Sequence, residues 1–272
     1  MIRKILGDLA NGLLKLQYAT CPITTWMPRF YRAKKLIDKH APKTLDASCG
    51  TGEFTVWLSK QGMKMSGVNI SEHEIDVARK NAHQAGCYID FQVGDLSGKT
   101  PFADASFDQI ISLDTVVHIF DIPAVFREFH RLLKPGGRLV LSLASFAPSG
   151  RGGLFWGENL LRKFTPRFLY APATYQGKSW LTLSADEQQK RFYQHVVFTP
   201  ATLETQICGL FVLSHQEYAI HLFTSLATDL IFGLRFVKYI EPLIFVLAAR
   251  LDCLFFSKHR PGYLMFVTLQ KI

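Results

Sequence analysis

The sequence lacks the cysteine patterns of a disulfide-stapled or zinc-binding protein. Its five cysteines are odd in number, widely scattered and never spaced as Cys-x-x-Cys. This argues against a disulfide framework and against a metal site, and it makes a reducing cytosol the expected location. The chain also lacks a hydrophobic run long enough to cross a bilayer, which takes ~20 residues. Its most apolar stretch, residues 221–256, is interrupted repeatedly by charged side chains.

The sequence is also poor in charged residues, whereas hydrophobic residues are abundant. Charged residues make up 19% of the chain and hydrophobic residues 48%, with 22 phenylalanines. This composition indicates some apolar surface that meets a lipid, a hydrophobic substrate or another subunit. The formal net charge of +9 adds attraction to an anionic partner. A membrane surface, a nucleic acid and a phosphorylated substrate are all compatible with that charge.

Residues 45–53 form a glycine-rich turn between a predicted strand and a predicted helix. Residues 43–47 have the pattern of a short buried strand, and from Glu53 the apolar residues have helical spacing. Gly50 and Gly52 lack a Cβ, so the backbone can turn tightly and lie close to a ligand. The turn has neither the Gly-Lys-Ser/Thr of a P-loop nor the Gly-x-Gly-x-x-Gly of a dinucleotide site. We expect it to hold a nucleotide-like ligand, with a plain tight turn as the alternative.

Strands and helices are predicted to alternate along most of the chain. The predicted strands are residues 43–47, 63–68, 88–93, 107–113, 138–143, 210–214 and 262–269. Helices are predicted at residues 29–40, from Glu53, from 71 to 86, at 121–133 and from Thr199, and Ser71 with Glu74 has the pattern of a capping box. This alternation implies parallel pairing through right-handed crossovers. The expected fold class is α/β: a doubly wound, mostly parallel, seven-stranded Rossmann-like sheet with an inserted helical and aromatic cover.

Three candidate binding features directly follow three of the predicted strands. The glycine turn follows Ala47, Asn69 ends the second strand, and Asp95 comes just after the third. Ligands of doubly wound sheets bind at the carboxyl ends of the strands. We therefore expect these features to lie together at one edge of the sheet.

Five segments have a motif-like composition, at residues 45–52, 67–71, 94–96, 102–108 and 132–139. In order and spacing they resemble the motifs of the class I S-adenosylmethionine-dependent methyltransferases, nearest to the branch that acts on quinones, sterols and natural products. The resemblance covers residues 30–145 closely and 199–270 in outline. The usual first motif is Asp/Glu-x-Gly-Cys/Thr/Ser-Gly-x-Gly, and this chain departs from it at Ser48.

The resemblance implies that S-adenosylmethionine is the cofactor. In that family the glycine loop lies under the amino acid half of the cofactor, an acidic side chain binds both ribose hydroxyls, and an Asp after the third strand accepts from the adenine amino group. The cofactor-binding residues implied here are Asp46, Ser48, Gly50, Thr51, Gly52, Asn69, Ile70, Asp95, Leu96 and Leu113. Asn69 stands where Asp or Glu is commonest, so we expect weaker cofactor binding or a contact shared with Ser71, and we expect an Asp at position 69 to tighten binding.

Taken with the resemblance, the chain is predicted to be a single methyltransferase domain over residues 1–272. Residues 1–42 are expected to form N-terminal helices, and residues 43–145 the cofactor-binding core. Residues 146–198, rich in glycine, proline and aromatic side chains, are expected to be an inserted substrate cover. Residues 199–272 are expected to complete the sheet and to carry the apolar helices of residues 221–256.

His118 is the candidate catalytic residue. It comes just after the fourth predicted strand, where the acceptor should lie, and an imidazole near its usual pKa can take a proton from a hydroxyl group. A histidine that only hydrogen-bonds to the backbone or the cofactor is an equal alternative. His195 and Tyr175 in the expected cover are weaker candidates, and no metal is expected.

The expected function is methyl transfer to a hydrophobic small molecule such as a lipid, a quinone-like compound or a natural product, with O- or C-methylation favoured. Residues 113–116 do not carry the Asn/Asp-Pro-Pro-Tyr/Phe that is usual in nucleic-acid and protein amide methylases, so no nucleic-acid partner is expected. An N-methyltransferase and a non-catalytic scaffold are the alternatives. The expected location is cytoplasmic, with membrane-surface contact by residues 221–256, and an oligomer interface or a thick core is the rival explanation of that stretch. The oligomeric state and the acceptor stay open.

Overall fold

The computed structural model of the 272-residue chain describes residues 28–119, 121–145, 198–219, 251, 256–257 and 264–272. The predictions for residues 1–27 and for almost all of the expected cover and of the apolar stretch 221–256 lie outside these ranges. His195 and Tyr175 lie outside them too.

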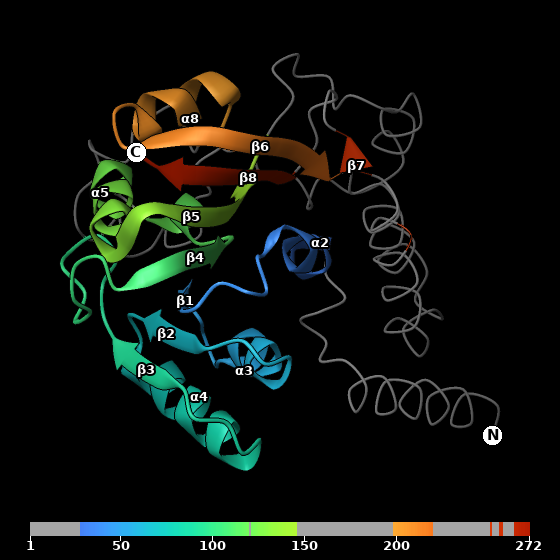
Figure 1. Cartoon of the computed structure of the whole chain (residues 1–272), viewed down its shortest axis with the longest axis vertical. Coiled ribbons are helices and arrows are strands. Elements are labelled where there is room, and N and C mark those ends of the chain that lie inside the picture. Colours follow the sequence, from blue (N-terminus) through green and yellow to red (C-terminus); the bar gives the residue numbers. More distant parts are fainter. Residues whose placement is uncertain (1–27, 120, 146–197, 220–250, 252–255, 258–263) are drawn as a thin grey trace, which may run out of the picture.

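The described strands form one mixed sheet in the order β3-β2-β1-β4-β5-β8-β6-β7 (Figure 1). Strands β1 to β5 pair in parallel, whereas β8 runs antiparallel to both β5 and β6. The strands are β1 Thr44–Ala47, β2 Met65–Asn69, β3 Asp90–Val93, β4 Phe107–Leu113, β5 Leu133–Ala144, β6 Phe211–Ala219, β7 Phe256–Ser257 and β8 Leu264–Lys271. The predicted mostly parallel α/β sheet is confirmed. Seven strands make up its body, and β7 adds two residues at the edge beside β6.

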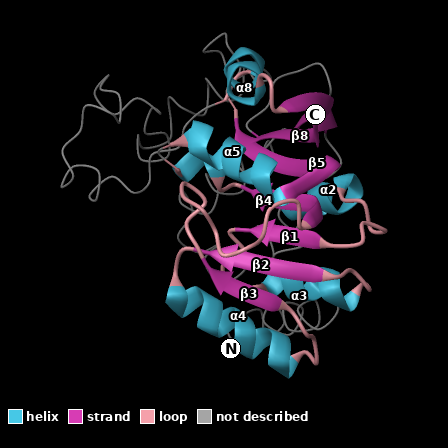
Figure 2. Cartoon of the chain, turned by 60° about the vertical axis from the view of Figure 1, so that its left-hand side comes forward, coloured by secondary structure: helices cyan, strands magenta, loops and turns pink. Residues whose placement is uncertain are grey.

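Helices cover both faces of this sheet (Figure 2). The described helices are α2 Pro28–Leu36, α3 Glu53–Lys60, α4 Glu72–Gln84, the 3₁₀ turn η2 Val116–His118, α5 Ile122–Leu132 and α8 Pro200–Ile207. On one face, buried side chains of α5 and α8, such as Phe129 and Leu203, share a core with β1, β4, β5, β6 and β8. On the other face, α2 and α3 pack over β2 and β4, and α4 packs beside β3. No helix among the described residues is both long and apolar enough to cross a membrane.

Local sequence signals explain where several helices begin. The Asp121 carboxylate accepts a hydrogen bond from the Ala124 amide at 2.9 Å and caps α5. At α8, Thr199 and Thr202 form a reciprocal capping box, with Pro200 in the first turn. These pairs satisfy backbone N–H groups that have no partner within the helix, so both helices start at the predicted residues.

Helix α2 ends earlier than the sequence predicts, at Leu36 rather than near His40. The cause lies far away in the sequence. The buried side-chain amide of Gln109 accepts from the Asp38 N–H at 2.9 Å and donates to the Asp38 carbonyl at 3.2 Å. These bonds occupy the backbone groups of Asp38 and mark the end of the helix in place of Pro42.

The Pro135-Gly136-Gly137 segment differs from the expected break between helix and strand. Strand β5 begins at Leu133, immediately after α5, and this segment is an irregularity within the strand. Gly136 has φ of +70°, which a residue with a Cβ adopts only at a cost. The chain therefore passes from helix to strand without a separate loop.

Candidate active site

The glycine turn sits where the strand order reverses, between β1 and α3. Ser48, Gly50 and Gly52 all have positive φ, at +69°, +53° and +75°. The N–H groups of Ser48 and Cys49 both donate to the Val68 carbonyl, at 2.8 and 3.0 Å, which ties the turn to the end of β2. The turn is thus a fixed backbone cradle at the carboxyl end of β1, the position where doubly wound sheets bind ligands.

Gly50 and Gly52 are glycine for different reasons. A Cβ added at Gly52 would lie 2.8 Å from the Ala78 Cβ and 2.9 Å from Phe91 Cζ, so Gly52 allows close packing of the turn on α4 and β3. Among the described residues, a Cβ added at Gly50 would meet no atom within 4 Å. The space over Gly50 is therefore open, which fits a ligand lying against the backbone there.

Asp46, near the end of β1, is buried at 5% exposure. Its carboxylate accepts a hydrogen bond from Thr55 Oγ1 at 2.6 Å. Burial raises the pKa of Asp46 to about 6, and the bond from Thr55 offsets part of that rise. Thr55 is a site residue that sequence reasoning missed, because its link to Asp46 follows only from the way α3 folds back over β1.

Asn69 ends β2 and is buried at 7% exposure. Its side-chain nitrogen donates to the carboxylate of Glu74 on α4. Ser71 caps α4 as predicted, accepting from the Glu74 amide at 3.3 Å. The predicted return contact from the Glu74 carboxylate to Ser71 is replaced by the contact to Asn69. Ile70, the next residue after Asn69, is 63% exposed.

Asp95 and Leu96 follow β3 at the same edge of the sheet. The Gly94 amide donates to the Asn69 carbonyl at 3.0 Å, which joins this segment to the end of β2. The exposed Asp95 carboxylate accepts from the amide and the hydroxyl of Ser97, at 2.8 and 2.7 Å, and Leu96 is buried. The structure therefore brings the glycine turn, Asn69 and Asp95 to three neighbouring strand ends, as the sequence predicts.

The end of β4 carries the remaining candidates. Leu113 is partly buried and packs against the core under α2 and α3. Asp114 turns the chain at φ of +59°, and its amide donates to Ser142 of β5. His118 is exposed on η2, where its amide donates to the Thr115 carbonyl at 2.9 Å. His118 thus lies beyond the carboxyl end of β4.

Cys49 lies in the glycine turn with its side chain half-buried. Its pKa is raised, first by burial and then by the carboxylates of Asp46 and Glu74. A thiol that resists ionisation is a poor nucleophile, so Cys49 serves packing in the turn. Among the described residues, no three histidine, cysteine or acidic side chains are grouped as metal ligands.

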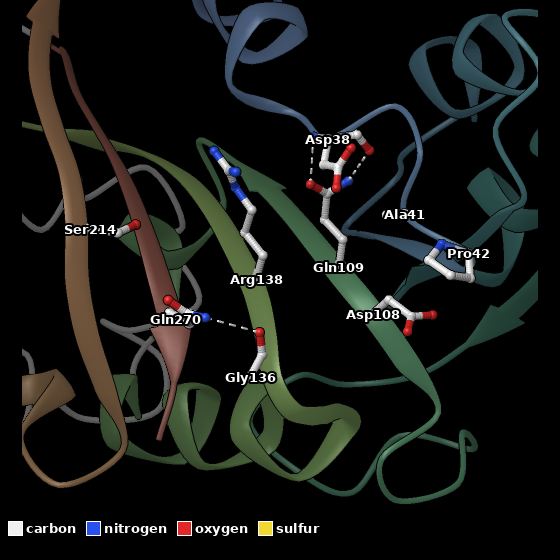
Figure 3. Close-up of a pocket in the computed structure, with 9 residues that line it drawn as sticks. All are labelled: Asp38, Ala41, Pro42, Asp108, Gln109, Gly136, Arg138, Ser214 and Gln270. Carbon is white, nitrogen blue, oxygen red and sulfur yellow. Dashed lines mark hydrogen bonds between the residues drawn. The ribbon is translucent and has the colours of Figure 1, made fainter.

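A polar cavity of about 350 Å³ lies at the other end of β4 and β5 (Figure 3). Its lining residues are Asp38, Ala41, Pro42, Asp108, Gln109, Gly136, Arg138, Ser214 and Gln270. Several of its polar groups already hold the fold together: Gln109 binds the backbone of Asp38, and Ser214 Oγ donates to the Thr268 carbonyl at 2.9 Å. This cavity is at the amino end of the strands and is separate from the glycine turn.

Comparisons with known proteins agree with this geometry. Residues 45–141 match the family model described as a methyltransferase domain. The chain is similar to methyltransferase GfsG of Streptomyces halstedii, with 37% identity over 37% of each chain. It is also similar to phosphoethanolamine N-methyltransferase 1 of Arabidopsis thaliana, with 36% identity over 40% of this chain and 22% of that one. The chain thus matches well under two thirds of the length of these relatives.

The fold is shared more widely than the sequence. A structure of geranyl diphosphate methyltransferase in complex with S-adenosylmethionine superposes with a TM-score of 0.51 at 15% identity, over 89% of this chain and 85% of that one. This likeness concerns the fold. The domain match over residues 45–141 and the relatives above identify that part of the chain as a class I, S-adenosylmethionine-dependent methyltransferase domain.

Proposed function

We propose that this chain transfers a methyl group from S-adenosylmethionine to a hydrophobic small molecule. The observation that carries the proposal is the turn after β1, with its positive-φ backbone and the open space over Gly50. A cofactor can lie against that backbone without displacing a side chain of the residues that the structure describes. A scaffold without turnover would have no need to keep this space open.

The proposed cofactor contacts follow the strand ends. Asp46, Ser48, Gly50, Thr51 and Gly52 hold the amino acid half of the cofactor, with Asp46 fixing the turn through Thr55. Asn69 and Ile70 contact the ribose, Asp95 and Leu96 contact the adenine, and Leu113 at the end of β4 is a further cofactor contact. The exposure of Ile70 beside a buried Asn69 supports this assignment, because an exposed aliphatic side chain at this edge of the sheet can pack against a ligand.

Methyl transfer requires little acid–base catalysis by the protein. The bound sulfonium supplies an activated methyl group, so the residues of the chain orient the acceptor and exclude water. We assign His118 as the base for a hydroxyl acceptor, because an exposed imidazole beyond β4 can meet a substrate at this edge and accept its proton. Carbon acceptors that lose no proton to the protein would leave His118 with a positioning role.

The acceptor class rests on composition. A chain that is 48% hydrophobic with 22 phenylalanines suits an apolar acceptor, and its net charge of +9 suits one that carries phosphate or lies at an anionic membrane surface. O- or C-methylation of a lipid, a quinone-like molecule or a natural product is the first proposal. The relative that acts on phosphoethanolamine favours the second candidate, N-methylation of a small phosphorylated amine.

Transfer of labelled methyl groups tests the reaction and its acceptor class. The full chain would be incubated with S-adenosylmethionine labelled in the methyl group and with a lipid extract of its own host, followed by phase partition and mass spectrometry. Label in an organic-phase product supports the proposal, and label only in an aqueous phosphobase supports the second candidate. Label in neither phase, from protein that binds the cofactor, contradicts both. His118→Gln should slow transfer to a hydroxyl acceptor and leave cofactor affinity unchanged.

We also propose a cytoplasmic location with contact to anionic membrane surfaces. The supporting feature is the apolar sequence of residues 221–256, in which Arg235, Lys238 and Arg250 are interspersed. Flotation with anionic and neutral liposomes, each at low and high salt, tests this proposal. Binding to anionic liposomes that weakens with salt supports it, and binding to neither leaves an oligomer interface or an extended core as the role of the segment.

A further inference from the structure

The carboxylate of Glu74, a residue of α4, lies against the end of β2. Asn69, the last residue of that strand, has an amide side chain in a nearly fully buried position. Its nitrogen donates to Glu74 Oε2, and its oxygen is 3.5 Å from the Ser71 amide, a weak contact. The strand end therefore presents an amide backed by a carboxylate from the neighbouring helix.

Glu74 reaches this position from the first turn of α4. The positive end of the helix dipole favours an acidic side chain there, and Ser71 already caps the helix by accepting from the Glu74 amide. In a capping box the Glu74 carboxylate would accept from the Ser71 amide. Here it accepts instead from the Asn69 side chain at the end of β2.

The charge of Glu74 also reaches the glycine turn. The pKa of Cys49 is raised by burial first, by the Asp46 carboxylate next, and by the Glu74 carboxylate as well. The Glu74 side chain thus accepts a hydrogen bond at the end of β2, and its charge acts on Cys49 in the turn after β1. These are the two strand ends between which the proposed cofactor lies.

The chemistry of the pair suits a vicinal diol. A carboxylate offers about four acceptor sites on two oxygens, and the bond from Asn69 uses one of them. The Asn69 oxygen, with its weak contact to Ser71, is a further acceptor. Two adjacent hydroxyl groups need two acceptors, and an ionised acceptor gives the stronger bond.

We propose that Glu74 binds the ribose hydroxyls of the cofactor, with Asn69 as the residue that positions its carboxylate. The acidic group at this place is supplied by α4 and not by the last residue of β2. The inference rests on the proposed function, because it needs an adenosine ribose in the cleft beside the glycine turn.

Calorimetric titration with S-adenosylhomocysteine and with its 2′-deoxy analogue tests the contact. The proteins are the wild type, Glu74→Gln, and the control Glu72→Gln. Glu72 is also acidic and in the first turn of α4, but it is exposed. Glu74→Gln is expected to weaken binding of S-adenosylhomocysteine about tenfold or more, the range for loss of a charged hydrogen bond. The affinity ratio between the two ligands should shrink toward one in Glu74→Gln and keep its wild-type value in Glu72→Gln.

The ratio separates a direct contact from a structural effect. Both ligands are titrated into the same preparation, so a partly unfolded fraction changes both affinities alike. An unchanged ratio in Glu74→Gln, with binding by the wild type intact, overturns the role of Glu74 and leaves the proposed function standing. Failure of the wild type to bind either ligand overturns the proposed function itself.

Discussion

The carboxylate of Asp46 on β1 and the hydroxyl of Thr55 on α3 are joined by a buried 2.6 Å hydrogen bond across the glycine turn. The turn between them is fixed at both ends, since the strand and the helix that flank it are bonded to each other. The bond from Thr55 stabilises the ionised form of Asp46, whereas burial of Asp46 disfavours it. The geometry of the turn is thus maintained at some expense in stability at neutral pH.

Replacing Asp46 by Asn should change how stability depends on pH. The pKa of Asp46 is about 6 in the folded chain against an ordinary value of 3.8, so the folded state holds the proton more tightly than the unfolded state. Ionisation of Asp46 therefore lowers the free energy of unfolding as pH rises from about 4 to about 6. Two pKa units correspond to roughly 3 kcal/mol at ~1.4 kcal/mol per unit.

Urea denaturation of the cofactor-free wild type and of Asp46→Asn between pH 4 and pH 7 measures this effect. The free energy of unfolding of Asp46→Asn, relative to the wild type, should increase by up to about 3 kcal/mol across that range and level off above pH 7. Taking the difference removes the contributions of other carboxylates. A difference that does not vary with pH would show that Asp46 is not buried as described.

A second buried carboxylate fixes α2 to the sheet. Arg32 of α2 forms a bidentate pair with Glu217 of β6, whose side chain is 2% exposed. Arg32→Met leaves that carboxylate buried without its guanidinium, which should cost about 3 kcal/mol of unfolding free energy. The exposed Lys39→Met is the control and should change stability by less than about 0.5 kcal/mol.

In chemical denaturation, Arg32→Met combined with Glu217→Leu should be more stable than Arg32→Met alone, because the double variant leaves no unpaired buried carboxylate at position 217. A double variant that is less stable than Arg32→Met would contradict this account.

Gly52→Ala should destabilise the protein, whereas Gly62→Ala should do so much less. Both glycines have positive φ, but an added Cβ at Gly52 lies within 3 Å of Ala78 and Phe91, whereas at Gly62 it meets no atom of the described residues within 4 Å. Overpacking and backbone strain together should cost about 2–4 kcal/mol at Gly52, and strain alone about 1–2 kcal/mol at Gly62. Equal losses in urea denaturation would mean that Gly52 does not pack as closely as the structure has it.

The sequence alone predicts the sheet, the glycine turn and the strand ends that carry Asn69 and Asp95. Strand β4 has its predicted bounds, because an apolar run flanked by polar residues is a local signal. The end of α2 and the course of the Glu74 side chain are not predictable in this way. The end of α2 depends on Gln109, which is 71 residues beyond Asp38 in the chain. The position of the Glu74 side chain depends on its contact with Asn69, which replaces the return contact of a local capping box. The two-residue β7 has no sequence signal, since it pairs only at the edge of β6.

The Asn69–Glu74 contact reverses the expectation that an Asp at position 69 would tighten cofactor binding. Asn69→Asp places a second carboxylate in contact with that of Glu74, and the two negative charges repel each other. Affinity for S-adenosylhomocysteine should fall roughly tenfold, the equivalent of ~1.4 kcal/mol. Asn69→Asp combined with Glu74→Gln exchanges the two groups and should bring affinity back toward the wild-type value. Calorimetry that finds tighter binding by Asn69→Asp alone would favour the simpler expectation from sequence.

The measurement that tests the central claim most directly is titration of S-adenosylhomocysteine into the wild type, Gly50→Val and Gly62→Val. Gly50 and Gly62 both have positive φ, and an added Cβ at either would meet no atom of the described residues within 4 Å, so the same substitution imposes backbone strain at both. Thermal melting of each variant checks that it is folded. We expect the wild type and Gly62→Val to bind with similar affinity, and Gly50→Val to lose at least tenfold, because its side chain fills the space over the turn. Equal affinity in Gly50→Val and the wild type would contradict a cofactor site over this turn.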